Sequence, residues 1–409
     1  MPKISAAKGI IINDSRGEKT IEVALLSGDI EGKASIPSGK SRGKMEAKTV
    51  PVERALENLD RFMRAASGRT FDSMREIDNF LIELDGTEDK RNLGANLTLA
   101  VSIAFSRLLS KEKGIPLHEL LRNESAAAAS SFPRLFINII NGGLHVNASL
   151  NPLPFQEQLI IPKTSSPEGA LKSAFSFIES LKGVLSPRGE GDRFGDEGGF
   201  VVSGLNPELG LELLDETRRI HDGEVDFGID AASSSLWNGK DKVYEWRESR
   251  WNGDELLEVY KWISERYNLL SIEDPFDEER EEEWRKLMRW LGEKNSGLWV
   301  IGDDLTVTSA KKIREMAKVG VANGVIIKPN QRGTVSETIA AADLARQFGW
   351  KIIVSHRSGE TDDDFIADLA YGIGADGLKA GSPLQQERLV KYKRLIQIEK
   401  SLKNESKLE

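Results

Sequence analysis

The sequence predicts an α/β fold in which a C-terminal (β/α)8-type barrel follows an N-terminal α+β cap domain. The main observation is a series of short apolar runs that each end in a polar or charged residue: Asp230, Glu273, Asp303, Lys328, His356 and Lys379. Successive members lie between 23 and 43 residues apart, about the length of one strand plus one helix. The C-terminal ends of barrel strands meet at one mouth, where active sites are built. We therefore expect these six side chains to lie together in a metal-dependent enzyme.

Composition limits the class of protein. A chain of 409 residues is long enough for one large barrel and a second, smaller domain. It contains no cysteine, which excludes disulfides, thiolate metal sites and thiol nucleophiles. The net charge of -9 argues against nucleic acid as the main partner. It does not exclude an anionic small substrate, which responds to the local field of its pocket.

The sequence shows no secretory signal and no apolar stretch long enough to span a membrane. We therefore expect a cytoplasmic protein with no membrane partner.

Three regions are predicted along the chain. The α+β cap domain covers residues 1–122, a linker rich in alanine and serine covers 123–131, and the barrel domain covers 132–409. Apolar periodicity predicts strands at 10–12, 20–26, 136–140 and 159–161, and helices at 52–66, 97–113, after Pro167 and at 387–402. From Asp226 onward, strands and helices are expected to alternate to the end.

Three of the strand-end residues are hard oxygen donors. Asp230, Glu273 and Asp303 follow successive strands, and carboxylates together with water and substrate oxygens are the ligands that Mg²⁺ prefers. The alternative for any one of them is a helix cap, a common position for aspartate. Three carboxylates in register with two lysines and a histidine favour the metal site.

Lys328 ends a very apolar strand and precedes Pro329. A lysine near metal cations and low-dielectric walls has its pKa lowered, which suits a general base. The alternative is a lysine that only pairs with a neighbouring carboxylate.

Several glycine-framed loops carry polar groups. Gly195 to Gly199 holds Asp196 and Glu197, and the alternative to a site is a surface turn. The segment 355–361 offers a guanidinium and hydroxyls, suited to a phosphate or carboxylate, or else an ordinary helix N-terminus. The segment 37–43 is typical of a mobile lid or anion-binding loop but lacks the spacing of a P-loop. Asn141-Gly142-Gly143-Leu144-His145 adds one loop histidine, a weak signal by itself.

Taken together, these segments resemble the enolases, which interconvert 2-phosphoglycerate and phosphoenolpyruvate, and the resemblance covers almost the whole chain. Its motifs are Asp14-Ser15-Arg16-Gly17, Pro37-Ser38-Gly39 with Ser41, Leu93-Gly94-Ala95-Asn96, Asn141-Gly142-Gly143 with His145, Gly195-Asp196-Glu197-Gly198-Gly199, Ser271-Ile272-Glu273-Asp274-Pro275-Phe276, Asp303-Asp304-Leu305-Thr306-Val307-Thr308, Ser355-His356-Arg357-Ser358-Gly359-Glu360-Thr361 and Phe365-Ile366-Ala367-Asp368-Leu369. The resemblance implies a barrel of the enolase superfamily and two Mg²⁺ ions per active site.

The resemblance also implies a role for each site residue. Asp230, Glu273 and Asp303 would hold the first Mg²⁺, and Ser41 would help to bind the second together with the substrate phosphate. Lys328 would remove the C2 proton, and Glu197, aided by Glu157, would protonate the departing hydroxyl. The remaining substrate-binding residues would be His145, Gln156, His356, Arg357, Ser358 and Lys379. Enolase-superfamily sites are known for such a lysine or histidine base with one or two Mg²⁺ ions.

Four features depart from the usual family pattern. In the first loop, Lys40 and Arg42 add two positive charges where the family usually has alanine and threonine. The loop from His145 to Gln156 is a few residues longer than usual and contains two prolines, which could misplace His145. The segment 381–388 lacks the usual Arg-Ser before its Glu-Arg.

The fourth departure concerns the dimer. Family dimers tend to use ion pairs between the N-terminal strand and the last helix. Here Ile10, Gln397 and Lys400 replace an arginine, an arginine and a glutamate. A homo-oligomer is still possible because exposed ion pairs contribute little, but its usual charge pairs are absent.

Two alternatives to enolase activity stay open. One is an enolase-like paralogue that performs proton abstraction or lyase chemistry on another phosphorylated or carboxylated acid, since fold alone does not select the substrate. The other is a silenced enolase that acts as a binding protein. Retention of Lys328, Glu197 and the three carboxylates argues against silencing.

Overall fold

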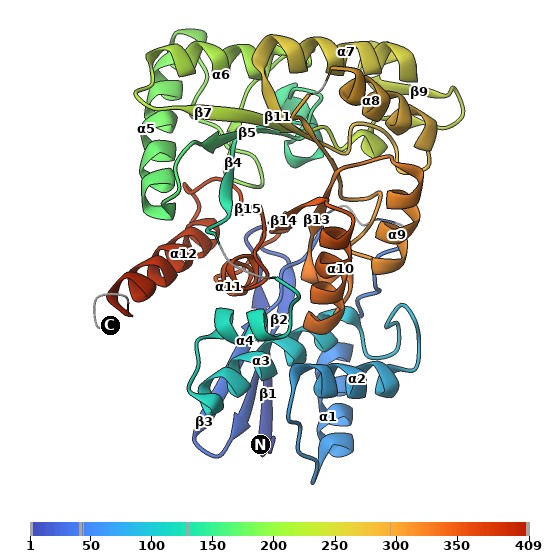
Figure 1. Cartoon of the computed structure of the whole chain (residues 1–409), viewed down its shortest axis with the longest axis vertical. Coiled ribbons are helices and arrows are strands. Elements are labelled where there is room, and N and C mark those ends of the chain that lie inside the picture. The colour runs from blue at the N-terminus through green and yellow to red at the C-terminus, as the bar shows by residue number, and fades with distance from the viewer. Residues whose placement is uncertain (1–2, 41–42, 44, 128–130, 295, 406–409) are drawn as a thin grey trace.

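The computed structural model of this chain describes residues 3–40, 43, 45–127, 131–294 and 296–405. The cap domain and the barrel domain are stacked, with the cap at the bottom of Figure 1 and the barrel above it. No helix in the described part of the chain is long and apolar enough to cross a membrane.

The cap domain is a three-stranded antiparallel sheet covered by helices. Its strands pair in the order β1-β2-β3. The elements are β1 (Ala6–Asn13), β2 (Lys19–Ser27), β3 (Ile30–Ser35), α1 (Val52–Ala66), α2 (Met74–Asp85), α3 (Ala95–Lys113) and α4 (Leu117–Asn123). The predicted strands and helices of this region are found, but β3, α2 and α4 were not predicted. Because a Cβ on Gly32 would lie 2.0 Å from the Ala104 carbonyl oxygen, glycine lets β3 approach α3 closely.

The second domain is a closed barrel. One sheet runs β15-β14-β13-β12-β11-β7-β5-β4-β6, and pairing of β15 with β4 closes the ring. The barrel strands are β4 (Arg134–Asn141), β5 (Glu157–Pro162), β7 (Val225–Asp230), β11 (Leu269–Glu273), β12 (Trp299–Gly302), β13 (Gly324–Ile327), β14 (Lys351–Ser355) and β15 (Gly377–Lys379), with β6 (Phe200–Val201) beside β4. This confirms the predicted barrel with its N-terminal cap.

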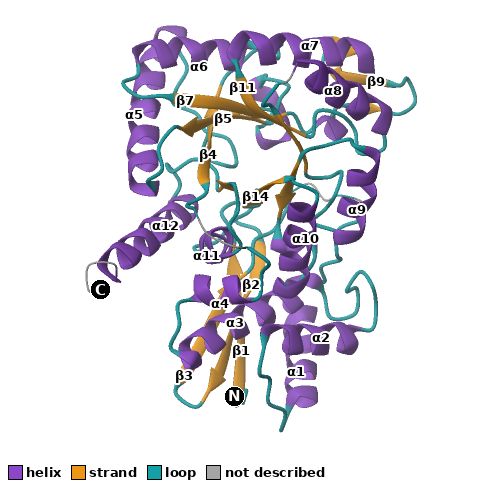
Figure 2. Ribbon diagram, viewed as in Figure 1, coloured by secondary structure: helices purple, strands orange, loops and turns teal. Residues whose placement is uncertain are grey.

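Helices surround the ring of strands, as Figure 2 shows. They are α5 (Pro167–Leu185), α6 (Leu209–Ile220), α7 (Gly253–Tyr267), α8 (Glu281–Lys294), α9 (Ala310–Val319), α10 (Val335–Gln347), α11 (Phe365–Gly372) and α12 (Gln386–Glu405). Local signals set several of their ends. Asn252 and Glu255 form a capping box at the start of α7, and the Ser166 hydroxyl accepts from the Gly169 N–H at the start of α5.

One barrel strand runs against the others, so the expectation of a wholly parallel barrel is wrong. Strand β5 is antiparallel to both of its neighbours, β4 and β7. Its first residue, Glu157, therefore pairs with Asn141 and Asp230, which are the last residues of β4 and β7. Reversal of this strand brings Glu157 to the same mouth as the C-terminal ends of the parallel strands.

The expected alternation of strand and helix is interrupted once. A small antiparallel sheet of β8 (Trp237–Asn238), β9 (Val243–Trp246) and β10 (Ser249–Trp251) lies between β7 and α7. This insertion explains why the interval between Asp230 and Glu273 is the longest of the series.

The inside of the barrel is filled by its own cluster of apolar side chains. The cluster consists of Phe136, Leu159, Ile161, Ile301, Ile326 and Ile353, which come from five different strands and are at most 1% exposed. This plug is typical of barrels whose interior is a packed core, and it leaves the polar chemistry to the mouth.

The cap is joined to the barrel by a buried ion pair. Arg107, on α3, donates to the Asp363 carboxylate at 2.6 and 2.9 Å and to Asp364 at 2.8 Å. The Ser35 N–H also donates to Asp363, at 2.9 Å. Burial raises the pKa of Asp363, but Arg107 and the backbone donors outweigh burial and hold the pKa below its ordinary value. The predicted domain boundaries at residues 122 and 132 stay a prediction.

We predict that Arg107→Met lowers the free energy of unfolding by about 3 kcal/mol, because it leaves a buried carboxylate without its cation. Chemical denaturation followed by circular dichroism measures this. Asp363 has a depressed pKa in the folded state, so its stabilising contribution is present above pH ~4 and is lost as the pH falls further. The difference in the free energy of unfolding between Arg107→Met and the unaltered protein should therefore become smaller as the pH falls below ~4.

The matched control is Arg54→Met, since Arg54 pairs with Glu57 on one exposed helix face. An exposed pair of this kind contributes at most about 0.5 kcal/mol. Equal effects of the two substitutions would contradict the role of Arg107 at the interface.

Candidate active site

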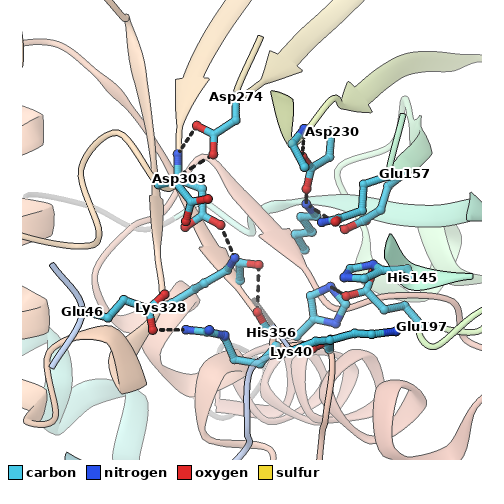
Figure 3. A pocket seen from close by; sticks show the side chains of 17 residues that line it. Lys40, Glu46, His145, Glu157, Glu197, Asp230, Asp274, Asp303, Lys328 and His356 are labelled. Atoms are coloured by element: carbon cyan, nitrogen blue, oxygen red, sulfur yellow. Dashed lines mark hydrogen bonds and ion pairs between the residues drawn. The ribbon is translucent and has the colours of Figure 1, made fainter. Parts of the chain in front are cut away.

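A polar pocket lies at the mouth of the barrel, where it meets the loops of the cap (Figure 3). Its empty volume, which includes space open to solvent at the mouth, is about 500 Å³. The lining residues are Lys40, Glu46, His145, Gln156, Glu157, Glu197, Asp230, Ala232, Asp274, Asp303, Asp304, Lys328, Ser355, His356, Arg357, Ser358 and Lys379. Nearly all of them carry polar or charged side chains.

Lys379 is surrounded by three carboxylates. Its ammonium lies 2.8 Å from Asp230, 2.8 Å from Glu273 and 3.0 Å from Glu157, and all four side chains are almost fully buried. Burial lowers the pKa of Lys379, but the three carboxylates outweigh burial and raise it well above its ordinary value. Lys379 therefore stays charged and compensates part of the negative charge.

Lys328 pairs with Asp303 on the neighbouring strand ends. Asp303 also accepts a hydrogen bond from Gln331 at 2.9 Å, and Gln331 is in turn oriented by the Thr308 hydroxyl at 2.6 Å. Burial lowers the pKa of Lys328, but Asp303 outweighs burial and raises the pKa above its ordinary value. The expected lowering of the Lys328 pKa is therefore wrong for the protein without metal, because the carboxylate is the nearest charge.

The backbone is strained where the carboxylates are presented. Asp274 has a φ of +41° and Val307 a φ of +43°, values rarely adopted by residues with a side chain. In this conformation the Asp274 carboxylate accepts the N–H groups of Asp303 and Asp304 at 2.8 and 2.9 Å. The strained turn thus fixes the chain that carries Asp303.

The acidic residues can accommodate a hard cation. Ligand atoms of Asp274, Asp303 and Asp304 lie within 4.8 Å of one another among the described residues. Burial and Asp230 raise the pKa of Glu273 to about 8, and burial and Asp303 raise that of Asp304 to about 7. Such shifts report negative charge in excess of the two lysines.

A second sign of a cation site is an unused ligand atom. Glu273 Oε1 is buried and accepts no hydrogen bond from any described residue. The chemistry of the donor set, together with this free oxygen, fits a divalent cation with oxygen ligands.

Two glutamates face each other on the other side of the pocket. Ligand atoms of His145, Glu157 and Glu197 lie within 4.8 Å of one another. Burial and Glu197 raise the pKa of Glu157 well above its ordinary value. Burial also acts to raise the pKa of Glu197, but His145 and the cationic Arg388 act in the opposite direction, and the pKa is held well below its ordinary value. The surroundings of the pair therefore make Glu157 the better proton holder of the two.

His356 is oriented by Arg388, on α12. Arg388 donates to His356 Nδ1, and since arginine only donates, this nitrogen is the acceptor. The ring proton therefore lies on Nε2, which is 3.7 Å from Glu197 Oε1. Burial and the cationic Arg388 lower the pKa of His356 well below its ordinary value despite Glu197, so the ring is neutral.

The expected phosphate-binding residues meet a loop of the cap. Arg357 donates to Glu46 at 3.0 Å and to Asn330 at 3.1 Å. A Cβ on Gly39 would lie 1.9 Å from the Arg357 guanidinium, so any larger residue here would displace this guanidinium. The Ser358 hydroxyl accepts from the Lys40 N–H at 2.8 Å. The two cap and barrel segments are further joined by a β-bridge between Ser38 and Gly359.

The long loop after His145 is held by the inserted sheet. Trp246 Nε1 donates to the Pro152 carbonyl at 3.1 Å, and Arg247 donates to the Ala148 carbonyl at 2.6 Å. His145 Nδ1 lies 3.4 Å from Glu197 Oε2, and the ring is buried. The extra length of the loop therefore does not remove His145 from the pocket.

Most of the predicted site residues meet in this pocket. Those that line it are His145, Gln156, Glu157, Glu197, Asp230, Asp303, Lys328, His356, Arg357, Ser358 and Lys379. Glu273 lies directly behind Lys379, in contact with its ammonium. Ser41, expected at the second metal ion, lies outside the described residues, as does Arg42.

Sequence reasoning missed several residues of the site. Glu46, Asp274, Asp304, Gln331 and Arg388 all contact residues that it had selected. Asp274 and Asp304 adjoin Glu273 and Asp303 in the sequence, which was a usable signal. Glu46 and Arg388 lie far along the chain from their partners, and no local pattern indicates their contacts.

Comparisons with known proteins agree over both domains. Residues 4–121 match the family model described as "Enolase, N-terminal domain", and residues 129–409 match "Enolase, C-terminal TIM barrel domain". The chain is similar to proteins named "Enolase" from Neorickettsia sennetsu (39% identity, 98% of this chain and 99% of the relative) and Methanopyrus kandleri (36% identity, 98% and 96%). A protein of that name from Thermococcus gammatolerans is 38% identical over 98% of this chain and 95% of its own length.

We predict that divalent-metal binding strengthens as the pH rises from 6 to 8. A carboxyl with a pKa of about 8, such as Glu273, is largely protonated below that pH and must lose its proton to bind metal. The affinity should increase by up to about tenfold per pH unit for each proton displaced. Isothermal titration calorimetry in buffers of different ionisation enthalpy measures both the affinity and the proton release.

The matched pair of variants is Glu273→Gln and Glu265→Gln, since Glu265 is an exposed glutamate paired with Lys294. Glu273→Gln should weaken metal binding, and Glu265→Gln should leave it unchanged. A metal affinity that does not change with pH or with Glu273→Gln would contradict the assignment.

Proposed function

The chain belongs to the enolase family, and we propose that it catalyses the reversible, Mg²⁺-dependent dehydration of 2-phosphoglycerate to phosphoenolpyruvate. The observation that carries the proposal is the placement of acid and base. Lys328 lies on one side of the pocket, and Glu157 and Glu197 lie on the other (Figure 3). Dehydration needs two such groups, because one proton is removed while another is delivered to the leaving group.

The reaction breaks the C2–H bond and the C3–O bond of the substrate. The electron pair of the C2–H bond becomes the C2–C3 double bond, and hydroxide leaves C3 as water once it receives a proton. The C2 proton is weakly acidic because its removal adds charge beside an existing carboxylate. The site must therefore concentrate positive charge around the substrate carboxylate.

Lys328 is the proposed base. In the ligand-free protein Asp303 raises its pKa and keeps its proton in place. A cation held by Asp303 would weaken the interaction of this carboxylate with the Lys328 ammonium and so lower the lysine pKa, and Lys328 that has released its proton to solvent could then accept the proton from C2. This coupling between metal site and base gives a physical reason for a metal requirement.

Bound Mg²⁺ would supply the positive charge that stabilises the anionic substrate and its dianionic intermediate. Asp230, Glu273 and Asp303 are the proposed ligands of the first ion. Ser41 is proposed for the second. Lys379, buried between Asp230 and Glu273, adds a permanent cation at the same place.

Glu157 and Glu197 are the proposed acid pair. Burial and Glu197 raise the pKa of Glu157, which favours a protonated carboxyl that can protonate the departing hydroxide. His145 and His356 flank Glu197 at 3.4 and 3.7 Å, and Asn138 Nδ2 donates to its carboxylate at 3.2 Å. Arg357 and Ser358 are proposed to bind the phosphate, and Gln156 completes the wall of the pocket.

The cap loop supports a phosphorylated substrate over a simple carboxylic acid. Arg357 is buried against Glu46, so a phosphate must compete with this carboxylate for the guanidinium. A dianionic phosphate is a stronger competitor than a monoanion. A silenced binding protein is disfavoured because the acid, the base and the carboxylates are all present in contact geometry.

The oligomeric state and the cytoplasmic location stay predictions. In the structure, Lys400 pairs with Glu168 of its own chain at 2.9 Å, and Ile10 is exposed. We expect the usual family dimer to be weakened, so that it dissociates on dilution in analytical ultracentrifugation. A dimer that persists at nanomolar protein would contradict this.

We predict that Lys328→Ala abolishes exchange of the substrate C2 proton with solvent, while Glu197→Gln retains it. General bases contribute about 10² to 10⁴ in rate, so the loss should be at least about a hundredfold. Both variants should lose net dehydration. Nuclear magnetic resonance of 2-phosphoglycerate in deuterated buffer with Mg²⁺ measures the exchange.

The comparison of the two variants separates base from acid on one scaffold. Exchange that survives Lys328→Ala would refute Lys328 as the base. Absence of exchange in the unaltered protein, with Mg²⁺ bound, would refute 2-phosphoglycerate as its substrate.

A further inference from the structure

Lys40 contacts three different segments of the site from the first loop. Its ammonium donates to the Leu144 carbonyl at 2.7 Å and pairs with the Asp196 carboxylate at 2.9 Å. Its backbone N–H donates to the Ser358 hydroxyl at 2.8 Å. Figure 3 shows the side chain of Lys40 extending toward the side of the pocket that carries Glu197.

Each of these partners is, or directly precedes, a residue of the proposed machinery. Leu144 precedes His145, and Asp196 precedes Glu197. The two segments already lie side by side, because the Asp196 N–H donates to the His145 carbonyl at 2.9 Å. Lys40, on the first loop, contacts both of these segments and so links them through its ammonium.

We propose that Lys40 is a positioning residue for the acid end of the pocket. Its ammonium fixes the backbone on either side of the His145–Glu197 contact, and its N–H fixes the hydroxyl of Ser358. This inference rests on the proposed function for its effect on catalysis, but the contacts themselves do not depend on any substrate.

The proposal accounts for two features in which this chain departs from the usual family pattern. The enolases usually carry alanine at the position of Lys40, and an alanine side chain cannot reach Leu144 or Asp196. The loop after His145 is also longer here. Trp246 and Arg247 hold its far part, at Pro152 and Ala148, and Lys40 holds its start at Leu144.

The competing role for Lys40 is a direct contact with the substrate anion. The side chain is 44% exposed and lines the pocket, so an anion can reach it. A direct ligand would have to leave Asp196 to bind the substrate, whereas a positioning residue keeps both contacts. Removal of Asp196 therefore has opposite consequences: it frees a direct ligand, but it disables a positioning residue.

The test compares the full-length protein with Lys40→Met, Asp196→Ala, the double variant and Lys40→Arg. The matched control is Lys33→Met, since Lys33 is an exposed lysine paired with Glu22 in the cap. The first measurement is amide hydrogen exchange at residues 142–146 and 195–199 without any ligand. The second is steady-state dehydration of 2-phosphoglycerate with Mg²⁺, at low and high salt.

In the first measurement, Lys40→Met should accelerate exchange in both segments by about two- to fivefold, the size expected for a partly exposed ion pair. Lys33→Met should change neither segment. Unchanged exchange in Lys40→Met would overturn the proposal whatever the activity.

In the second measurement, Lys40→Met should lower kcat about two- to fivefold with KM nearly unchanged. Asp196→Ala should add little to Lys40→Met, because both remove the same contact. Lys40→Arg should restore part of kcat, and high salt should reduce the difference between Lys40→Met and the unaltered protein. A rise in KM with normal kcat, or full additivity of the two substitutions, would overturn the proposal.

The two measurements separate the inference from the function. If the unaltered protein does not dehydrate 2-phosphoglycerate, the proposed function fails while the exchange measurement still decides the role of Lys40.

Discussion

Two lysines, the buried Lys379 and the partly buried Lys328, neutralise part of a carboxylate cluster at the mouth of the barrel, and the rest of the site depends on this interaction. Lys379 lies among Asp230, Glu273 and Glu157, and Lys328 pairs with Asp303. Burial and the neighbouring Asp230 raise the pKa of Glu273 to about 8, and Glu273 Oε1 accepts no hydrogen bond from any described residue. Because negative charge is in excess, this site favours the binding of a cation. We therefore propose that cation binding at Asp303 would favour release of the Lys328 proton.

The geometry that concentrates these charges comes from the barrel and from one reversed strand. Parallel strands deliver Asp230, Glu273 and Lys379 to the mouth with their last residues. Strand β5 runs in the opposite direction and delivers Glu157 with its first residue. The apolar plug below keeps water out of the barrel, so the charges interact through protein and through each other. The cap closes the remaining side, where Glu46 meets Arg357 and Lys40 meets Asp196.

The periodicity of the apolar runs was enough to place the strand-end residues, because a barrel forces the C-terminal ends of its parallel strands together. The direction of β5 was not accessible in the same way, since an apolar run reads alike in both directions, and only the family resemblance drew attention to Glu157. The small sheet at 237–251 is short and rich in polar residues, so it left no clear alternation. Arg388 and Glu46 act through contacts between segments far apart in the chain, which a single sequence does not encode locally. For the same reason, the sequence showed the charge of Lys40 but did not indicate its contacts with Leu144 and Asp196.

The measurement that tests the central claim most directly is the ultraviolet absorbance of the enol double bond after the purified protein is mixed with 2-phosphoglycerate, with and without Mg²⁺. The account predicts a rise in absorbance that requires Mg²⁺, because the carboxylate cluster must hold a cation before Lys328 can act as the base. An equal rise without any divalent metal would contradict the electrostatic coupling of metal and base. No rise, although Mg²⁺ binds, would contradict 2-phosphoglycerate as the substrate of this site.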